Sequence, residues 1–476
     1  MSLPAADHYS PQLRTALVLT GTGTAGAYHA GVLRALHEAG VKLDVVAGRG
    51  IGVVGALFAA IDGAPRLWDE KGFWRSSAVT AFYRWHRLLR FGAWALAVAL
   101  ATVALPIAVM ALGLVVYPID FVLKMIGVGG ASGLAGWYVQ TARAASGPDG
   151  FPTWLPRVVV LVLGAAGLIA IVNAWRIAGR RRQRGQLWWR LVPAPLSSDS
   201  ITDHCWRVMW HLLRGAAHLK QPSAADLGRR YTELLAENLG QPGFRELLIA
   251  VHDLDAHRDL VFALVPESRR RDLIKRPTSE AADARRAEVF DLNGVGRDYL
   301  ADAVGAALTV PMATDSHELT FAPDAYWRGE THRLCDRPGA LARILDELAE
   351  LDVEQAIVVS ACHLSPGPHA LAPGRLDGRA RLGDYLQSTE VAAVRDAVRL
   401  AASKIMRIFT VHPSHNPIGP FDFSGSYDDR SDRRHPLFEL MNRGYEDAYH
   451  QFVEPVVGAS GERMGSAAAG PSGRRG

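Results

Sequence analysis

Cysteine is scarce in this sequence. The 476 residues include three cysteines, which lie far apart, at Cys205, Cys335 and Cys362. None belongs to a CxxC pair or to a histidine–cysteine cluster, so the pattern indicates neither a disulfide framework nor a zinc site. The first residues also lack a basic start followed by an apolar core, so we expect no cleaved signal peptide. A reducing, cytosolic environment fits these absences.

An excess of charge of one sign is lacking too. The formal net charge is +4 at pH 7, and the basic residues are clustered. A nucleic-acid partner therefore has little support, whereas a membrane surface fits basic clusters beside apolar segments. No metal site and no cofactor are predicted. The apolar share of 49% is ample for a large core.

Charged residues are missing altogether from one long stretch, residues 91–119. Its length exceeds the roughly 20 residues that cross a bilayer, so we expect a transmembrane helix, kinked near Pro106. A second run, residues 158–175, is shorter and pairs with the first by position. A buried helical pair inside a soluble protein is the alternative, although so many uncharged residues are unusual for a core helix.

Arginines flank both runs and predict their orientation. They precede the first run and follow the second, which places both outer ends in the cytoplasm. A two-helix hairpin returns the chain to the side that it left, so the sequence before and after it can form one cytoplasmic domain. These arginines are Arg84, Arg87 and Arg90, then Arg176, Arg180, Arg181, Arg182 and Arg184.

The most regular pattern lies in residues 15–63. The strand-like "TALVLT" leads through "GTGTAG" into an apolar-periodic segment that stops at Gly40, and "LDVVAG" and "IGVVGALFAAI" repeat the alternation. Alternating strands and helices of this length predict an α/β fold with a parallel sheet.

Two mechanisms compete for "GTGTAG". In a dinucleotide fingerprint, the glycines would let a pyrophosphate approach the helix N-terminus. In an oxyanion loop, the same backbone N–H groups would stabilise a tetrahedral intermediate. A dinucleotide site also needs an acid at the far end of the second strand, whereas Asp44 lies at its start. The oxyanion loop is therefore favoured.

The second strand leads into "GRGIG", which has the GxSxG spacing of a nucleophile elbow. Gly50 stands at the serine position, with Gly48, Arg49 and Gly52 around it. At this point "LTGTGTAGAYHAGVLRALHEAG" and "DVVAGRGIGVVGAL" together resemble the opening of a patatin-like phospholipase domain. The resemblance covers about residues 14–80 and continues, more weakly, over 240–362.

This resemblance implies a three-layer α/β fold with a mostly parallel sheet covered by helices, here interrupted by the transmembrane hairpin. It also implies a serine–aspartate dyad. Counting back from the apolar strand "AIVVSA" finds Asp336 as the acid, although Arg337 and Pro338 replace the family's glycines. An alternative alignment uses "WRGE" and leaves Arg328 at that place. The implied oxyanion loop comprises Gly21, Thr22, Gly23, Thr24, Ala25 and Gly26.

Gly50 cannot form an alkoxide, so an acyl-enzyme cannot build up by the family mechanism. The sequence therefore predicts a lipid acyl hydrolase fold without turnover that binds membrane lipid or a partner. Three alternatives stay open: an active esterase with another nucleophile, an engineered inactive form, and a nucleotide-binding membrane protein. Arg49 could hold a phosphate or carboxylate, or lie solvated on a loop. The oligomeric state is not predicted.

The expected organisation follows from these segments. Residues 1–85 begin the α/β domain, 86–185 form the hairpin, 186–240 a helical linker or lid, 241–457 the rest of the domain, and 458–476 a flexible tail. Two groups of potential metal ligands are interpreted as packing or surface residues and as a polar loop, respectively. They are His204, His211 and His218, and then His412, His415, Asp422, Asp428, Asp429 and Asp432.

Overall fold

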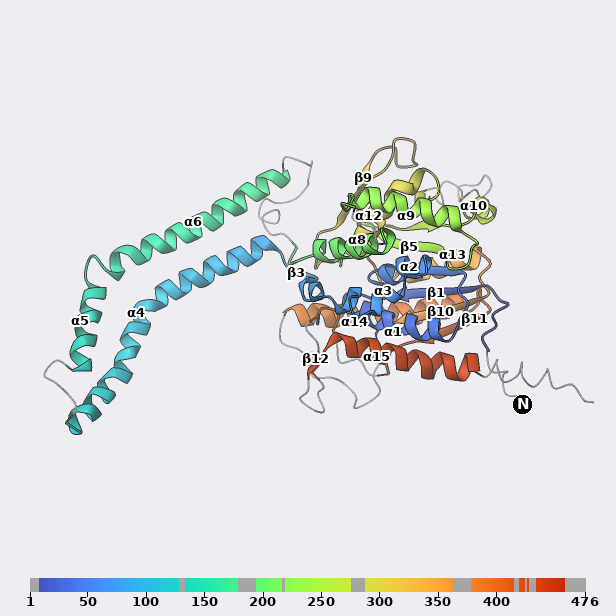
Figure 1. The fold of residues 1–476 in the computed structure, drawn as a ribbon. Helices are drawn as coiled ribbons and strands as arrows, with labels where there is room; N and C mark the ends of the chain where they lie inside the picture. The colour runs from blue at the N-terminus through green and yellow to red at the C-terminus, as the bar shows by residue number, and fades with distance from the viewer. Residues whose placement is uncertain are drawn as a thin grey trace, which may run out of the picture. The chain divides into compact units, whose positions relative to one another are not determined.

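A computed structural model of the chain describes nine stretches of the sequence. These stretches form two compact units. The first unit comprises residues 1–84 and 196–476, and the second comprises residues 85–195. The hairpin region is thus an insertion in the first unit, as Figure 1 shows by colour. The described segments are 8–127, 133–178, 194–215, 219–274, 287–362, 378–414, 419–423, 426–427 and 434–458. The basic run at 180–184 and the tail from 459 lie outside them.

The first unit is built on one mixed, mostly parallel sheet. Its strand order is β11-β10-β1-β2-β5-β6-β7, and β9 joins β5 and carries β8 at its other edge. The pairs from β11 through β5 are parallel, whereas β5 pairs antiparallel with β6 and β9. Buried β-branched and apolar residues fill the central strands, as expected for a sheet covered on both faces.

The sheet strands have the following bounds: β1 Thr15–Thr20, β2 Val45–Gly48, β5 Glu246–Asp253, β6 Arg258–Leu264, β7 Val289–Asp291, β8 His317–Thr320, β9 Thr331–Cys335, β10 Gln355–Ser360 and β11 Arg407–Val411. The short pairs are β3 Arg84–Trp85 with β4 Leu196–Ser197, and β12 Ser426–Tyr427 with β13 Arg434–His435.

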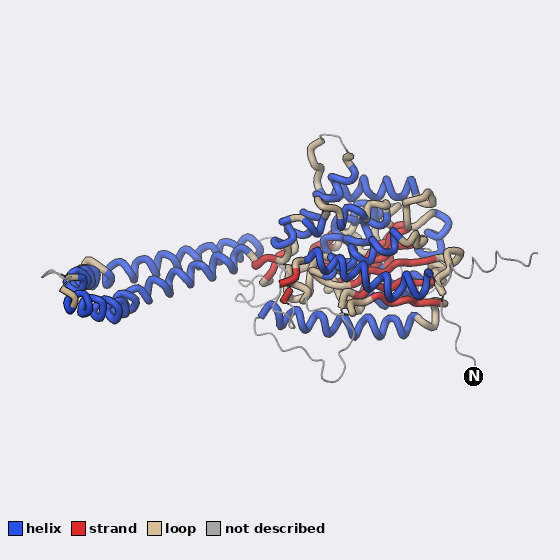
Figure 2. The backbone as a smooth tube through the Cα atoms, turned by 60° about the horizontal axis from the view of Figure 1, so that its bottom comes forward, coloured by secondary structure: helices blue, strands red, loops and turns tan. Residues whose placement is uncertain are grey.

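Helices cover both faces of this sheet, and each face has its own hydrophobic core. Helices α1, α2, α8, α9, α12 and α15 contribute to one core, and α10, α13 and most of α14 contribute to the other. Figure 2 shows the strands in red between the two helical layers. The α/β architecture with a mostly parallel sheet, predicted from residues 15–63, is confirmed.

The helices of this unit have the following bounds: α1 Ala25–Glu38, α2 Gly52–Ala60, α3 Pro65–Trp68, η1 Phe73–Arg75, η2 Ser77–Ala81, α8 Asp199–Leu213, α9 Ala224–Asn238, α10 Glu267–Ile274, η3 Val295–Tyr299, α12 Leu300–Ala307, α13 Ala340–Glu350, α14 Gly378–Ala401, α15 Leu437–Ala448 and the π-helix η4 Tyr449–Gly458.

The second unit consists of helices α4 (Arg87–Met125), α5 (Leu134–Ser146) and α6 (Phe151–Ala178). Two of them, α4 and residues 151–172 of α6, are long and apolar enough to cross a membrane, with mean hydropathies of 2.5 and 2.4. Their apolar side chains are mostly exposed, because only 11% and 0% of the two apolar windows is buried. A core helix of a soluble protein would instead bury such residues.

The helix α5 packs along the second half of α4, antiparallel to it. At its start, the Ala135 N–H donates to Asp120, and further along the Tyr138 hydroxyl donates to the Val109 carbonyl at 2.8 Å. Both Pro106 and Pro118 lie inside α4, which continues through them. The sequence placed the end of the first apolar run at 119, and the structure extends the helix to Met125.

Candidate functional site

The candidate site lies where the sheet changes its winding direction. From β1 the chain passes through α1 to β2, and from β10 it passes through α14 to β11 on the other side of β1. In open α/β sheets, ligands bind outside the carboxyl ends of strands at such a switch point. The glycine loop after β1 and the turn after β2 both lie at this edge.

The turn after β2 has the geometry of a nucleophile elbow. Gly50 has a φ of +53°, in the left-handed region, and α2 begins two residues later. A Cβ at Gly52 would lie 2.1 Å from the Leu19 carbonyl oxygen, so the close approach of α2 to β1 requires glycine there. A Cβ at Gly50 would lie 2.3 Å from the Gly21 carbonyl oxygen and 2.8 Å from Asp336 Oδ2.

Asp336 thus lies beside the elbow. It directly follows β9 and is 2% exposed. Both of its carboxylate oxygens accept from Arg49 Nη1 at 2.8 Å, and backbone N–H groups of Gly50 and Arg337 also donate to it. The alternative position, Arg328, lies on an exposed turn with a φ of +43°.

Arg49 is fully buried rather than solvated. Its second terminal nitrogen, Nη2, donates to Glu390 of α14, and the Thr20 hydroxyl donates to the other carboxylate oxygen of Glu390. One guanidinium from near the N-terminus therefore joins two buried carboxylates that both come from the C-terminal half of the sequence. The family pattern does not include Glu390, and its sequence neighbourhood gives no local signal for this role.

The electrostatics of the cluster follow from its burial. Burial raises the pKa of Asp336, against the lowering effects of the Arg49 guanidinium and of the two backbone donors. Nearby, burial lowers the pKa of His29 to about 4, although the Thr20 carbonyl accepts from its ring and opposes the shift. Arg49 adds to the lowering for His29. His29 is thus a neutral imidazole at neutral pH.

The glycine loop makes hydrogen bonds within the chain at its two ends. The Ile51 N–H, which directly follows the serine position, donates to the Gly21 carbonyl at 3.0 Å. In a nucleophile elbow this N–H belongs to the oxyanion hole. At the other end of the loop, the Thr24 N–H donates to the Pro420 carbonyl at 2.9 Å.

Residues 419–423 lie directly on the glycine loop. Besides the bond to Pro420, the Thr24 hydroxyl donates to the Gly419 carbonyl at 2.9 Å. A Cβ at Gly23 would lie 1.7 Å from the Pro420 oxygen, so the contact leaves no room for a side chain. The sequence interpretation treated this segment as part of a polar loop and missed the contact.

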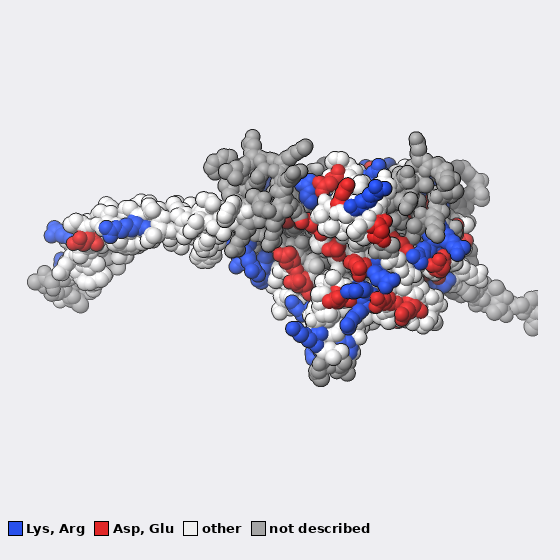
Figure 3. Space-filling model, turned by 90° about the horizontal axis from the view of Figure 1, so that it is seen from above, with Lys and Arg blue, Asp and Glu red and all other residues white. Residues whose placement is uncertain are grey.

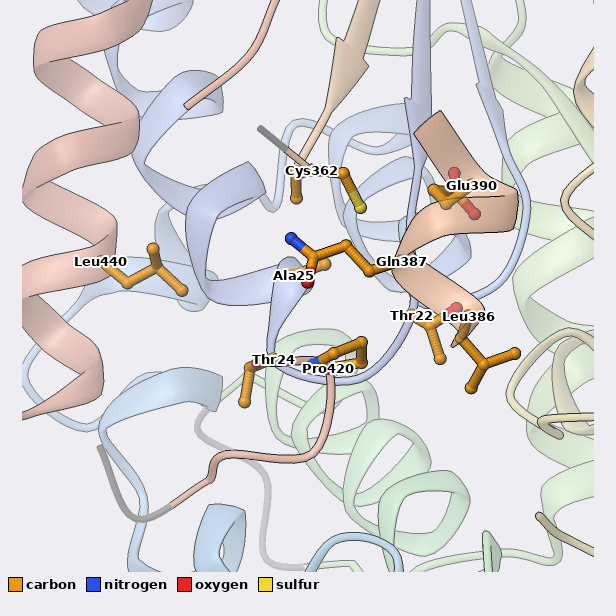
Figure 4. Close-up of a pocket in the computed structure, with 10 residues that line it drawn as sticks. Thr22, Thr24, Ala25, Cys362, Leu386, Gln387, Glu390, Pro420 and Leu440 are labelled. Atoms are coloured by element: carbon orange, nitrogen blue, oxygen red, sulfur yellow. The ribbon is translucent and has the colours of Figure 1, made fainter. Parts of the chain in front are cut away.

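A small cavity borders the loop. Thr22, Ala25, Gln387 and Glu390 are among the residues around it in Figure 4. Its volume is about 20 Å³, which is room for one water molecule and not for an acyl chain. The last loop residue, Gly26, is packed against the Trp74 ring.

The other predicted positions fall away from this site. Asp44 lies at the opposite end of β2, where its carboxylate accepts from the Thr15 N–H at 2.9 Å. His204 is buried in α8 and its ring contacts the Phe73 carbonyl. Among the described residues, no group of three His, Cys, Asp or Glu side chains could hold a metal ion. Outside the described residues lie His218, His415, Asp428, Asp429 and Asp432.

Comparison with known proteins identifies one related family. Residues 17–109 match the model of the family "Patatin-like phospholipase". The mouse and human proteins named "Patatin-like phospholipase domain-containing protein 6" are 48% identical to this chain over 63 residues. That segment is 13% of this chain and 5% of the relatives' length. The part of the chain that is similar to this family, residues 17–109, includes the glycine loop and the elbow.

Among solved structures, the crystal structure of VipD from Legionella pneumophila is similar at 12% identity. The alignment covers 94% of this chain and 69% of that one, with a TM-score of 0.31.

Proposed function

We propose that this chain is a membrane-anchored patatin-like protein that binds lipid or a partner and does not hydrolyse esters. The observation that carries the proposal is the elbow itself. Gly50 supplies no nucleophile, and Asp336, the acid beside it, has both oxygens engaged by the buried Arg49.

Two requirements of acyl transfer are unmet in this arrangement, and one donor needed for a third is occupied. A nucleophile needs a side chain at the elbow, and glycine has none. A general base needs a free lone pair within reach of the nucleophile's proton, but Arg49 and two backbone donors engage Asp336. An oxyanion hole needs unoccupied donors, and one of the donors of a nucleophile elbow, the Ile51 N–H, already donates to the Gly21 carbonyl.

The membrane part of the proposal rests on the exposed apolar surface of α4 and α6. A helix of 39 residues is about 58 Å long, and the hydrocarbon core of a bilayer is about 30 Å thick. Figure 3 shows this surface as nearly all uncharged on the face in view, apart from a small group of charges near the turn of the hairpin. We place the α/β unit in the cytoplasm because arginines precede the first apolar run and follow the second in the sequence.

The direct test is reaction with a fluorophosphonate probe, read by intact mass on the full chain in lipid nanodiscs. We expect no adduct on the wild type. We also expect none on Gly50→Ser, because the new Cβ meets the Gly21 carbonyl and its hydroxyl faces an acid held by Arg49. A serine-containing patatin-like hydrolase in the same nanodiscs serves as the positive control.

An adduct on the wild type would contradict the proposal and would identify the missing nucleophile by peptide mapping. An adduct on Gly50→Ser alone would show that the rest of the machinery is intact. The loss of hydrolytic activity would then be due to the missing serine side chain alone, and neither Arg49 nor the Gly21 carbonyl would block the site.

A further inference from the structure

A second, larger cavity lies beside the site, on the other side of Cys362. Its volume is about 220 Å³, and it is separate from the small cavity at the glycine loop, although Cys362 lines both. Pockets for drug-sized ligands are larger, at roughly 300–1,000 Å³. The cavity therefore suits one narrow chain and cannot enclose a whole two-chain phospholipid.

One wall comes from helix α14. Val391, Val394 and Val398 follow one another at spacings of three and four, so they form a single apolar stripe along the helix. Arg395 and Arg399 also line the cavity, one residue beyond two of these valines. The wall is thus apolar along its length and cationic along one side.

The opposite wall comes from the carboxyl ends of two neighbouring parallel strands. Ser360 ends β10, and Thr410 and Val411 end β11, followed by His412. This is the edge of the sheet at which open α/β folds bind ligands. The buried Val411 continues the apolar surface, and His412 adds a polar group.

The two arginines that line the cavity indicate the charge of a suitable ligand. The Arg395 guanidinium lies 3.3 Å from the carboxylate of Asp396, so its charge is partly matched. Arg399 has no carboxylate partner among the residues that the structure describes. An apolar channel beside a guanidinium that has no carboxylate partner among the described residues suits a ligand that combines hydrocarbon with a carboxylate.

We propose that this cavity binds a single-chain fatty-acid anion, with its hydrocarbon along the α14 valines and its carboxylate at Arg399. The assignment rests on the proposed lipid-binding function and gives that function a location and a ligand class. It also explains how a chain with a water-sized cavity at its elbow could bind lipid at all.

The test is photo-crosslinking of the full chain in phosphatidylcholine nanodiscs, with a dodecanoate that carries a diazirine on its chain. We expect crosslinks in peptides from α14 and β11. Val394→Trp should fill the channel and lower their yield at least about tenfold, equal to about 1.4 kcal/mol of binding free energy. Arg399→Glu should lower the yield severalfold, and dodecanoate should compete better than dodecanol.

Two variants serve as matched controls. Ala392→Trp adds the same ring on the exposed side of α14, and Arg230→Glu reverses an exposed charge on α9. Both should leave the yield unchanged. If Val394→Trp lowers the thermal stability, Val398→Trp and the surface variant Arg399→Glu decide the question.

Crosslinks confined to other peptides, or a yield that neither channel variant changes, would overturn the proposal. Equal competition by dodecanol would overturn the carboxylate assignment. A fluorophosphonate adduct on the wild type would overturn the absence of hydrolysis without affecting the crosslinking pattern, so the two failures are distinguishable.

Discussion

Replacing Arg49 by methionine should show how strongly its guanidinium stabilises the buried carboxylates at the elbow. The substitution keeps an apolar stem of similar length and removes the guanidinium that joins Asp336 and Glu390. Both carboxylates are nearly fully buried, at 2% and 3% exposure. Removing one partner of a buried ion pair costs about 3–5 kcal/mol, because the remaining charge is left uncompensated.

The expected change is measurable as a melting temperature. The larger compact unit comprises residues 1–84 and 196–476, and we expect it to unfold as one unit. For a unit of this size, a loss of roughly 4 kcal/mol corresponds to a decrease in Tm of about 5 °C. The assay is tryptophan fluorescence during heating, in nanodiscs. The control, Arg230→Met, removes an exposed arginine and should change the free energy of unfolding by less than about 0.5 kcal/mol.

The effect of Arg49→Met on the Tm should also depend on pH. Burial raises the pKa of Asp336 in the folded state, and Arg49 opposes the increase. An acid with a raised folded pKa contributes stability that is present below its unfolded pKa and is lost as the pH rises through the folded value. Without Arg49 the folded pKa rises further, so the Tm difference between variant and wild type should be smallest near pH 4 and widen toward pH 8.

A Tm for Arg49→Met within about 1 °C of the wild type at pH 8 would refute this reasoning. A difference that grows as the pH falls would refute it too. The triple variant with Asp336→Asn and Glu390→Gln should recover much of the loss, because it removes both uncompensated charges.

Two further predictions concern the glycine loop and helix α1, which follows it. Gly23→Ala should lower the Tm far more than Gly40→Ala. Both glycines have a φ of +63°, but only Gly23 contacts Pro420. Equal losses of Tm would show that residues 419–423 do not pack on the glycine loop. His29→Gln should make the stability of the fold less sensitive to acid. Because burial lowers the pKa of His29 to about 4, the residue contributes stability that is present above about pH 6.5 and is lost as the pH falls toward 4. The loss amounts to up to about 3 kcal/mol. Tm measured from pH 4 to pH 7.5 checks this, and an unchanged pH profile would contradict it.

The parts of the fold that could be predicted are those with a local pattern. The strand, glycine loop and helix over residues 15–38 follow from periodicity and turn chemistry, and the structure has them as β1 and α1. Uncharged length was enough to locate α4 and α6. The helix α5, which lies between the two uncharged runs, was not predicted.

The parts of the site that could not be predicted depend on distant contacts. Asp336 was found by counting from a recognisable strand, and the structure places it beside Gly50. Glu390 lies 341 residues from Arg49, and residues 419–423 reach the loop from beyond β11. Nothing in their own sequence marks them, since a surface-like acid and a proline–glycine loop acquire these roles only through packing.

The first measurement to make is the release of fatty acid from phosphatidylcholine nanodiscs by the wild-type chain, compared with Asp336→Asn. We expect both to release no more fatty acid than empty nanodiscs, while a serine-containing patatin-like hydrolase is active in the same assay. Release by the wild type that Asp336→Asn abolishes would contradict this expectation, because Asp336 would then be a working catalytic residue despite Arg49.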